Sequence, residues 1–381
     1  MVGGTFKRKR KTGRIIVNGT FHNPNWFFAH ISPLAASGYG EVILICDEPI
    51  AELPNLTYVC PPAWLGRIFS RALVKFIYTF FVGLRNPADV FVGYHIFPSA
   101  VTALVCARLL GSRAVYQVAA GELELQGGGF GAENKLLVGL NRASKWVELL
   151  AHKVANQFDL IVVRGSKAKH YIQQIGYNGH IEVVTGSVVV DASLMQEKRD
   201  IDVLFVGRLT EYKRPDRFLK IIQKVVVSQP ACRVCLAGDG PDRNELELLA
   251  ESLGIAKNVE FLGQRSDVPE LMGRAKLFAL SSRWEGVSIA MLEAMSVETV
   301  PVVTDVGDMR DFAESGVTGF VFDENDLDGF AEAISTLLND ESQRRRIGKA
   351  GRELILQRCE RGRLSQRWCS IFSEITANGV T

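Results

Sequence analysis

The sequence predicts an α/β protein with two Rossmann-like domains that face each other across a cleft. Three observations support this prediction. The chain of 381 residues is too long for one ordinary core, apolar β-branched runs alternate with helix-like segments throughout, and a polar break near residue 195 separates two such sets. This alternation is typical of parallel sheets covered by helices on both faces. In such sheets, ligands bind at the carboxyl ends of the strands.

Each half contains six segments that we expect to be strands, because apolar and β-branched residues cluster there. They are 14–18, 41–46, 89–93, 114–118, 160–163 and 181–184 in the first half, and 202–206, 232–237, 259–262, 277–280, 300–304 and 320–322 in the second. The pattern predicts four parts of the chain. These are a basic disordered tail (1–13), a first Rossmann-like domain (14–195), a second one (196–358) and a C-terminal helix (359–381).

The composition is that of a globular protein, with 47% hydrophobic and 23% charged residues. The 44 basic residues nearly balance the 42 acidic ones. Six basic residues lie within the first 14 positions, so the rest of the chain is slightly acidic, which argues against a nucleic-acid-binding body. Seven scattered cysteines, and the lack of an apolar stretch after the basic N-terminus, predict a reduced cytoplasmic protein without a signal peptide.

Two segments raise the question of a membrane. Residues 90–107 contain no Asp, Glu, Lys or Arg over eighteen positions, the length of a spanning candidate. His95 and Pro98 favour a buried strand, a turn and a helix there. Residues 67–85 are basic, aromatic and helix-like, with an uncharged core too short to span. This helix either packs as an ordinary surface helix or rests on an anionic membrane, which would make the protein peripheral on the inner face.

A first candidate site follows the first strand of the second half. The segment Val-Gly-Arg-Leu-Thr-Glu-Tyr-Lys-Arg-Pro-Asp at 206–216 links that strand to a helix. Arg208 and Lys213 therefore lie at the carboxyl edge of a strand and close to a helix start, where backbone N–H groups and fixed cations hold anions such as a diphosphate. The alternative is a solvated loop with ordinary surface charges.

A second candidate site occupies 281–295, with the sequence Ser-Ser-Arg-Trp-Glu-Gly-Val-Ser-Ile-Ala-Met-Leu-Glu-Ala-Met. Gly286 lets a ligand approach the backbone, and the free N–H groups of residues 287–289 mark a helix start. The alternative role of Glu285 is a favourable interaction with the helix dipole. Glu293 lies inside a helix that is apolar nearly all round. We therefore expect it to be buried, with ligand hydroxyls as suitable partners, rather than solvent-facing.

These motifs together resemble the retaining glycosyltransferases of the GT-B fold, in the large family called family four or glycosyl transferases group 1. Two glutamates separated by seven residues, after an Arg-x-x-x-x-Lys loop, begin the resemblance. Further matching segments are 236–241, 259–264, 301–307 and 316–321 and, more weakly in the first half, 87–95, 159–166 and 183–188. A helix at about 364–375 resembles the family's crossing helix, which packs back on the first domain.

The resemblance implies that the first domain binds an acceptor and the second a nucleotide-sugar donor. Arg208 and Lys213 would hold the donor diphosphate and stabilise the charge on the leaving group. Glu285 would contact the transferred sugar, and Glu293 the ribose hydroxyls. Arg208, Lys213 and Glu285 are thus the catalytic candidates, and no metal or other cofactor is expected. The donor-binding candidates are Gly207, Arg208, Lys213, Gly263, Arg265, Glu285, Gly286, Val287, Ser288, Ile289 and Glu293.

The chain departs from the family at three places. After the first strand, His-Asn-Pro-Asn-Trp-Phe-Phe stands where many relatives have a Gly-Gly loop. Ala-Ala-Gly-Glu at 119–122 replaces a His-Gly pair whose histidine usually contacts the donor sugar. Glu122 and His95 are candidates for the acceptor side, each with the alternative of a structural role. Asp308 and Asp311 replace a glycine and a glutamate, which we interpret as tolerated variation.

The sequence therefore predicts a retaining glycosyltransferase that moves a sugar from a UDP- or GDP-sugar to a glycan or lipid-linked acceptor. The segment at 121–129 looks similar to bacterial enzymes of cell-surface polysaccharides, which favours that role. We find no carboxylate pair for double displacement and expect the donor phosphate to accept the acceptor's proton. Two alternatives are a non-catalytic nucleotide-sugar-binding protein and a dinucleotide-dependent oxidoreductase. The oxidoreductase is disfavoured because Gly-Asp-Gly at 238–240 lacks the third glycine of its fingerprint.

Overall fold

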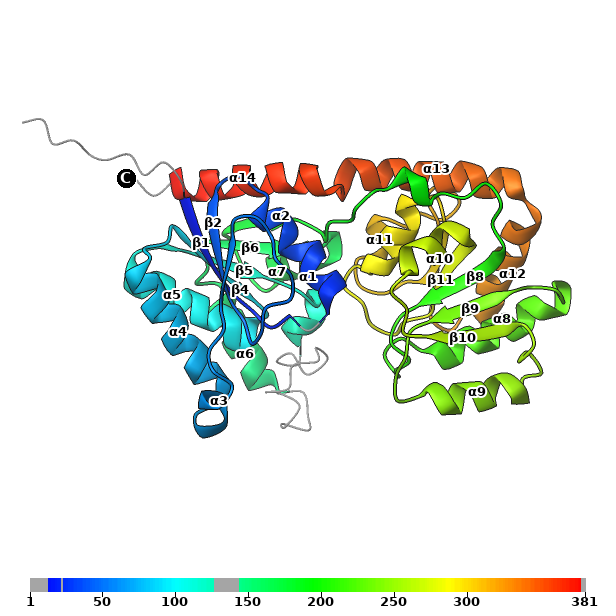
Figure 1. The fold of residues 1–381 in the computed structure, drawn as a ribbon, viewed down its shortest axis with the longest axis horizontal. Coiled ribbons are helices and arrows are strands. Elements are labelled where there is room, and N and C mark those ends of the chain that lie inside the picture. Colours follow the sequence, from blue (N-terminus) through cyan, green and yellow to red (C-terminus); the bar gives the residue numbers. More distant parts are fainter. Residues whose placement is uncertain (1–12, 22, 127–143, 378–381) are drawn as a thin grey trace, which may run out of the picture.

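The computed structural model describes residues 13–21, 23–126 and 144–377 (Figure 1). In this part of the chain, two parallel β-sheets form the centres of two α/β domains that stand side by side, as the alternation of strands and helices predicts. Residues 1–12 of the predicted basic tail lie outside the described residues, and Gly13 already belongs to the first strand.

The first domain contains a seven-stranded sheet with the order β3-β2-β1-β4-β5-β6-β7. Its strands are β1 (Gly13–Asn18), β2 (Gly40–Ile45), β3 (Leu56–Val59), β4 (Val90–Tyr94), β5 (Arg113–Gln117), β6 (Leu160–Val163) and β7 (His180–Val183). Its helices are α1 (Pro24–His30), α2 (Ser32–Ala35), α3 (Leu65–Ile68), α4 (Arg71–Arg85), α5 (Val101–Leu110), α6 (Lys145–Ala155) and α7 (Ser166–Gln174). Successive residues of β1 face opposite sides of the sheet, so Ile16 joins the core with α5 and α6, whereas Val17 joins the core with α1 and α2.

The second domain contains a six-stranded sheet with the order β10-β9-β8-β11-β12-β13. Its strands are β8 (Ile201–Val206), β9 (Val234–Ala237), β10 (Val259–Gly263), β11 (Ala275–Leu280), β12 (Val300–Thr304) and β13 (Phe320–Phe322). Its helices are α8 (Pro215–Ser228), α9 (Arg243–Ser252), α10 (Val268–Arg274), α11 (Ile289–Ser296), α12 (Leu327–Asn339) and α13 (Glu341–Arg358). One large apolar core joins this sheet to its helices.

The C-terminal helices run along one side of the molecule and connect the second domain back to the first (Figure 1). Helix α13 contacts α11 and α12, whereas α14 (Arg361–Ala377) packs on α2 of the first domain. Trp368, Ile371 and Phe372 of α14 are buried in the same core as α1 and α2. The last helix is therefore part of the first domain's hydrophobic core, as the resemblance implied.

One strand of the first sheet was not predicted from the sequence. Strand β3 pairs in parallel with β2 at the edge of the sheet. Its four residues are mostly half-buried, because an edge strand has fewer neighbours than a central one. The continuous apolar run that marks a buried parallel strand is therefore absent.

The basic segment 67–85 is not one helix, which corrects the prediction. Phe69 and Ser70 are extended between α3 and α4, and the Ser70 side chain caps α4 by accepting a hydrogen bond from the Leu73 N–H at 3.2 Å. Lys75 is buried, and its ammonium lies 2.9 Å from the Asp47 carboxylate. It therefore does not belong to a basic surface.

The other membrane candidate, residues 90–107, forms β4, a short helical turn (Ile96–Ala100) and part of α5, as predicted. Within the described ranges, no helix combines the length and the apolar character that crossing a bilayer requires.

Two aspartates of the second domain cap a helix of the first. The Asp308 carboxylate accepts hydrogen bonds from the Lys167 and Ala168 N–H groups at 2.7 and 3.1 Å. The Asp311 carboxylate accepts from the Ser166 N–H and hydroxyl at 2.6 and 2.5 Å. The first three N–H groups of α7 are thus satisfied across the domain boundary, an arrangement that we call the interdomain cap. These aspartates were interpreted as tolerated variation, so their role corrects that prediction.

We expect the double substitution Asp308→Ala and Asp311→Ala to loosen the two domains. Removal of an N-cap side chain costs about 1 kcal/mol, so the contact between the domains should weaken by roughly 2 kcal/mol. Small-angle X-ray scattering should show an increased radius of gyration. The control is Asp328→Ala, which removes an exposed carboxylate paired with Lys224 on the second domain. An unchanged radius in the double variant would contradict the proposed role of the cap.

Candidate active site

The two candidate segments of the second domain meet at the carboxyl ends of neighbouring strands. Residues 207–214 follow β8, and residues 281–288 follow β11, its neighbour in the sheet. The Lys213 ammonium donates a hydrogen bond to Oε1 of Glu285 at 2.5 Å. The Ser282 hydroxyl donates to the same oxygen at 2.7 Å. The fold thus brings together two predicted residues that lie 72 positions apart in the chain.

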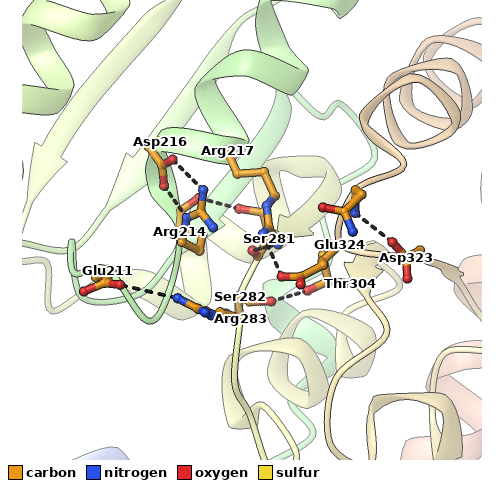
Figure 2. Close-up of polar contacts among 11 residues, drawn as sticks. Glu211, Arg214, Asp216, Arg217, Ser281, Ser282, Arg283, Thr304, Asp323 and Glu324 are labelled. Atoms are coloured by element: carbon orange, nitrogen blue, oxygen red, sulfur yellow. Dashed lines mark hydrogen bonds and ion pairs between the residues drawn. The ribbon is translucent and has the colours of Figure 1, made fainter.

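Further hydrogen bonds hold the two loops against each other (Figure 2). The Ser281 hydroxyl donates to the Arg214 carbonyl at 2.8 Å. The Arg217 guanidinium is buried; it donates to the Ser281 carbonyl at 3.3 Å and pairs with Glu324 at 2.8 Å. The two loops are therefore held together by groups within the motifs, Ser281 and Arg214, and by two residues outside them, Arg217 and Glu324.

Arg208 lies in the same loop, with an exposed guanidinium that makes no ion pair or hydrogen bond to any residue within the described ranges. Beside it, the Gly207 N–H donates to the Ala237 carbonyl at 3.0 Å, and the Gly238 N–H donates to the Gly263 carbonyl at 2.8 Å. Three glycines therefore stand side by side at the ends of β8, β9 and β10. They are closely packed, since a Cβ on Gly238 would lie 1.9 Å from the Gly207 oxygen. This row places Gly263 at the same sheet edge as Arg208.

Arg265 is bound to a near neighbour instead. Its guanidinium donates two hydrogen bonds to the Asp267 carboxylate, at 2.7 and 2.6 Å. The Arg265 side chain also lowers the pKa of Asp267. In the part of the chain that the structure describes, no hydrogen bond or ion pair joins Arg265 to the other candidate residues.

The start of α11 borders the first domain. Ser288 is buried and caps the helix by accepting a hydrogen bond from the Met291 N–H at 3.3 Å, whereas Val287 and Ile289 are partly buried. Gly286 lies so close to the first domain that a Cβ there would be 3.3 Å from the Ala119 oxygen. The backbone that was predicted to bind a ligand therefore lies at the boundary between the domains.

A cavity of about 170 Å³ lies between the domains beside Glu285. Glu122 and Lys167 line it from the first domain, and Trp284 and Glu285 line it from the second. Glu122 pairs there with Lys167, with 3.0 Å between the carboxylate and the ammonium. The predicted acceptor-side residue thus reaches the cleft, where it is already part of an ion pair.

His95 lies on the first-domain side, just after β4, with a positive φ of 63°. Its Nδ1 is 3.6 Å from Oε2 of Glu124, and 38% of its side chain is exposed. Glu124 was missed by the sequence analysis. Its buried carboxylate accepts hydrogen bonds from the Ala119 and Ala120 N–H groups at 2.7 and 3.0 Å and from the Tyr116 hydroxyl at 2.8 Å. Glu124 therefore shapes the loop in which the family's usual histidine is missing.

Burial alone would raise the pKa of Glu124, but His95 and the hydrogen bonds lower it overall, so this carboxylate is ionised at neutral pH. The only sequence feature that pointed to Glu124 was the segment Gly-Glu-Leu-Glu-Leu at 121–125, which contains both Glu122 and Glu124 in the same alternating pattern. The pattern did not distinguish Glu122, which faces the cleft, from Glu124, which is 2% exposed.

Glu293 lies on α11, partly buried, and within the described ranges no group hydrogen-bonds to its carboxylate. Burial raises the pKa of this carboxyl to about 7. An unpaired acid on an otherwise apolar helix costs stability, which fits the expectation that its partners come from a ligand.

No group of three or more His, Cys, Asp or Glu side chains suited to a metal ion occurs within the described residues. The expectation that Arg208 and Lys213 take the place of a metal stays a prediction.

Comparison with known proteins supports the resemblance. Residues 191–354 match the model of the family described as glycosyl transferases group 1. The second domain is therefore similar to the glycosyl transferases group 1 family. The predicted resemblance is thus confirmed, and with it the enzyme class of glycosyltransferases.

Two curated relatives agree with this assignment. One is the N-acetyl-alpha-D-glucosaminyl L-malate synthase of Bacillus anthracis, 23% identical over 77% of each chain. Another is the lipopolysaccharide core biosynthesis glycosyltransferase LpsE of Rhizobium meliloti, 27% identical, with 56% of this chain and 64% of that protein covered. The family and these names favour a transferase over an oxidoreductase.

The fold is similar to that of a solved structure, Anabaena Alr3699/HepE in complex with UDP. The TM-score is 0.75 at 17% sequence identity, with 95% of this chain and 100% of that chain covered. The two facing parallel-sheet domains therefore have the predicted GT-B architecture.

We expect Glu293→Gln to stabilise the protein at pH 8 and to change its stability little at pH 4. The folded-state pKa of about 7 lies above the ordinary value of 4.5, so the wild type loses stability as the pH rises from about 4.5 to about 7, where the unfolded chain releases this proton before the folded protein does. The difference between the two pKa values corresponds to about 3 kcal/mol. Urea unfolding measures the free energy at both pH values, with the exposed Glu332→Gln as control. An equal change at both pH values would refute the assigned pKa.

Proposed function

We propose that this protein is a retaining glycosyltransferase that transfers a sugar from a nucleotide-sugar to a glycan or lipid-linked acceptor in cell-surface polysaccharide biosynthesis. The observation that carries the proposal is the Lys213–Glu285 ion pair at the interdomain cleft, with the unpaired Arg208 in the same loop. A donor diphosphate would pair with both Arg208 and Lys213, and the sugar hydroxyls would donate hydrogen bonds to Glu285. The UDP held by the similar HepE structure favours a UDP-sugar as donor over a GDP-sugar.

The proposed reaction follows from these charges. The acceptor oxygen bonds to the anomeric carbon on the face from which the bond to the diphosphate oxygen breaks, and the acceptor's proton passes to that phosphate oxygen. The nucleoside diphosphate leaves with its charge stabilised by Arg208 and Lys213. Fixed cations aimed at a developing charge are often the largest catalytic contribution. Glu285, released from Lys213, would contact the transferred sugar.

Lys213→Ala and Glu285→Gln should each lower kcat/KM on the order of 100-fold, because each removes a group that acts on the developing charge. Thermal shifts with UDP, UDP-sugars and GDP-sugars measure donor binding first, and release of the nucleoside diphosphate measures turnover. Lys224→Ala removes a cation whose ion pair with Asp328 lies on the surface, and it serves as control. If both variants bind and turn over the donor like the wild type, the site assignment is wrong.

We further propose that the enzyme works on the surface of an anionic membrane, through α3 and α4. One face of α4 exposes four large apolar side chains at helical spacing, and three more lie in α3 or at its ends, next to α4. The exposed apolar residues are Trp64, Ile68, Phe69, Leu73, Ile77, Phe81 and Leu84. Exposed Arg67 and Arg71 border this apolar face. Such a face gains free energy by entering a headgroup region, and the arginines favour anionic lipid.

Ile77→Glu combined with Phe81→Glu should lower the partition onto phosphatidylglycerol-containing vesicles at least tenfold, because burial of one large apolar side chain is worth about 1.5–3 kcal/mol. Vesicle flotation is the measurement. Val227→Glu, at an 83% exposed position on α8, is the matched control. Arg67→Ala with Arg71→Ala should weaken binding mainly at low salt. Unchanged flotation of the Ile77 and Phe81 variant would leave α4 as an ordinary surface helix.

A further inference from the structure

One buried guanidinium of the first domain has no carboxylate beside it among the residues that the structure describes. Arg164 follows β6 at the carboxyl edge of the sheet and is 3% exposed. Its Nε donates to the Val118 carbonyl at 3.2 Å, and its Nη1 donates to Nδ1 of His30. Its Nη2 has no hydrogen-bond partner among the described residues. A buried N–H without an acceptor costs free energy, and a buried charge without a counter-charge costs more.

A second buried arginine shows the usual arrangement. Arg217 is 6% exposed, and its guanidinium lies 2.8 Å from the Glu324 carboxylate. Within the described parts of the chain, no carboxylate lies at ion-pair distance from Arg164. Burial lowers the pKa of Arg164 to about 10, so it still carries its charge at neutral pH. Both arginines are buried, and within the described residues only Arg217 has a counter-charge in contact.

The titratable groups around Arg164 do not neutralise it. Burial, the Arg164 charge and His95 hold the pKa of His30 well below its ordinary value, so this imidazole is neutral and accepts a hydrogen bond. Burial raises the pKa of Tyr94 to about 12, so its hydroxyl is neutral too. The Glu124 carboxylate attracts Arg164 from a distance, but its oxygens already accept four hydrogen bonds from other groups.

Arg164 lies behind the first-domain wall of the cleft. Its guanidinium carbon is 5.9 Å from the ring centroid of Trp26, and that ring stacks on His95 with 6.2 Å between centroids. His95 is 38% exposed, so on this side the rings of Trp26 and His95 lie between the guanidinium and solvent. On another side, His30 borders Gly186, against which Ile289 at the start of α11 also packs.

We propose that Arg164 binds an oxyanion of the acceptor, a phosphate or a carboxylate group, on the first-domain side of the cleft. The assignment to the acceptor rests on the proposed transferase function, in which Arg208 and Lys213 of the other domain hold the donor diphosphate. The anion would supply the missing acceptor for Nη2 and the missing counter-charge. A charged hydrogen bond of this kind also orients the group that carries it, because the guanidinium fork is planar.

The test is a titration of the full chain with inorganic phosphate and, separately, with malonate, at constant ionic strength. Thermal unfolding is followed in the wild type and in Arg164→Met, Arg164→Lys and Arg217→Met, and in the double variant Arg208→Ala with Lys213→Ala. We expect the anion to stabilise the wild type and the double variant. Arg164→Met should raise its dissociation constant at least tenfold, and Arg164→Lys, which keeps the charge without the fork, should raise it less.

Without added anion, Arg164→Met should be at least as stable as the wild type, because it removes an unpaired buried charge, whereas Arg217→Met should be less stable. A stronger response to phosphate than to malonate indicates a phosphate-bearing acceptor, and the reverse indicates a carboxylate. The proposal is wrong if neither phosphate nor malonate stabilises the wild type. It is also wrong if Arg164→Met is still stabilised by the anion, or if the double variant Arg208→Ala with Lys213→Ala is the only one that is no longer stabilised. A missing thermal shift with UDP and nucleotide sugars would instead count against the proposed function, and would leave the anion site standing.

Discussion

The relation between the two domains depends on the interdomain cap. The N-cap of α7 is Gly165, which has no side chain to accept a hydrogen bond, and Asp308 and Asp311 accept hydrogen bonds from the first three N–H groups of the helix. The positive end of a helix dipole favours these carboxylates, whereas burial raises the pKa of Asp308 and opposes its ionisation. Gly165 fits because a Cβ there would lie 2.3 Å from the Asp308 side chain. This contact fixes how closely the two sheet edges face each other.

The chemistry that we propose needs this closeness. Lys213 and Glu285 come from the second domain, whereas the loop organised by Glu124 comes from the first, and both border the same narrow space. The Lys213–Glu285 pair also explains how the site remains stable without substrate, since each charge satisfies the other. Glu293 has no such partner within the described residues, and burial raises its pKa, as expected of a carboxyl whose partners would come from a ligand.

The sequence predicted the sheets and the second-domain site because both follow local rules. All twelve expected strands exist, and Lys213 and Glu285 meet because parallel neighbours end at one edge. Contacts between distant segments were not predictable. The cap joins Asp308 to residues 140 positions away, so Asp308 and Asp311 looked like neutral variation. Lys75 lies in the segment 67–85 that was predicted to be a basic helix, yet it is buried against Asp47. The sequence pattern shows where charged residues lie along the chain, but their partners are known only from the folded structure.

Two buried cations among the described residues have an acidic partner. Lys75 has Asp47 and Arg217 has Glu324, as expected when charges leave water. Arg164 and Glu293 have no ionic partner within the described residues, and they lie on the two domains that face the cleft. We infer that the partners of Arg164 and Glu293 are ligands. An anionic acceptor would pair with Arg164 in the first domain, and the ribose hydroxyls of a nucleotide donor would hydrogen-bond to Glu293 in the second.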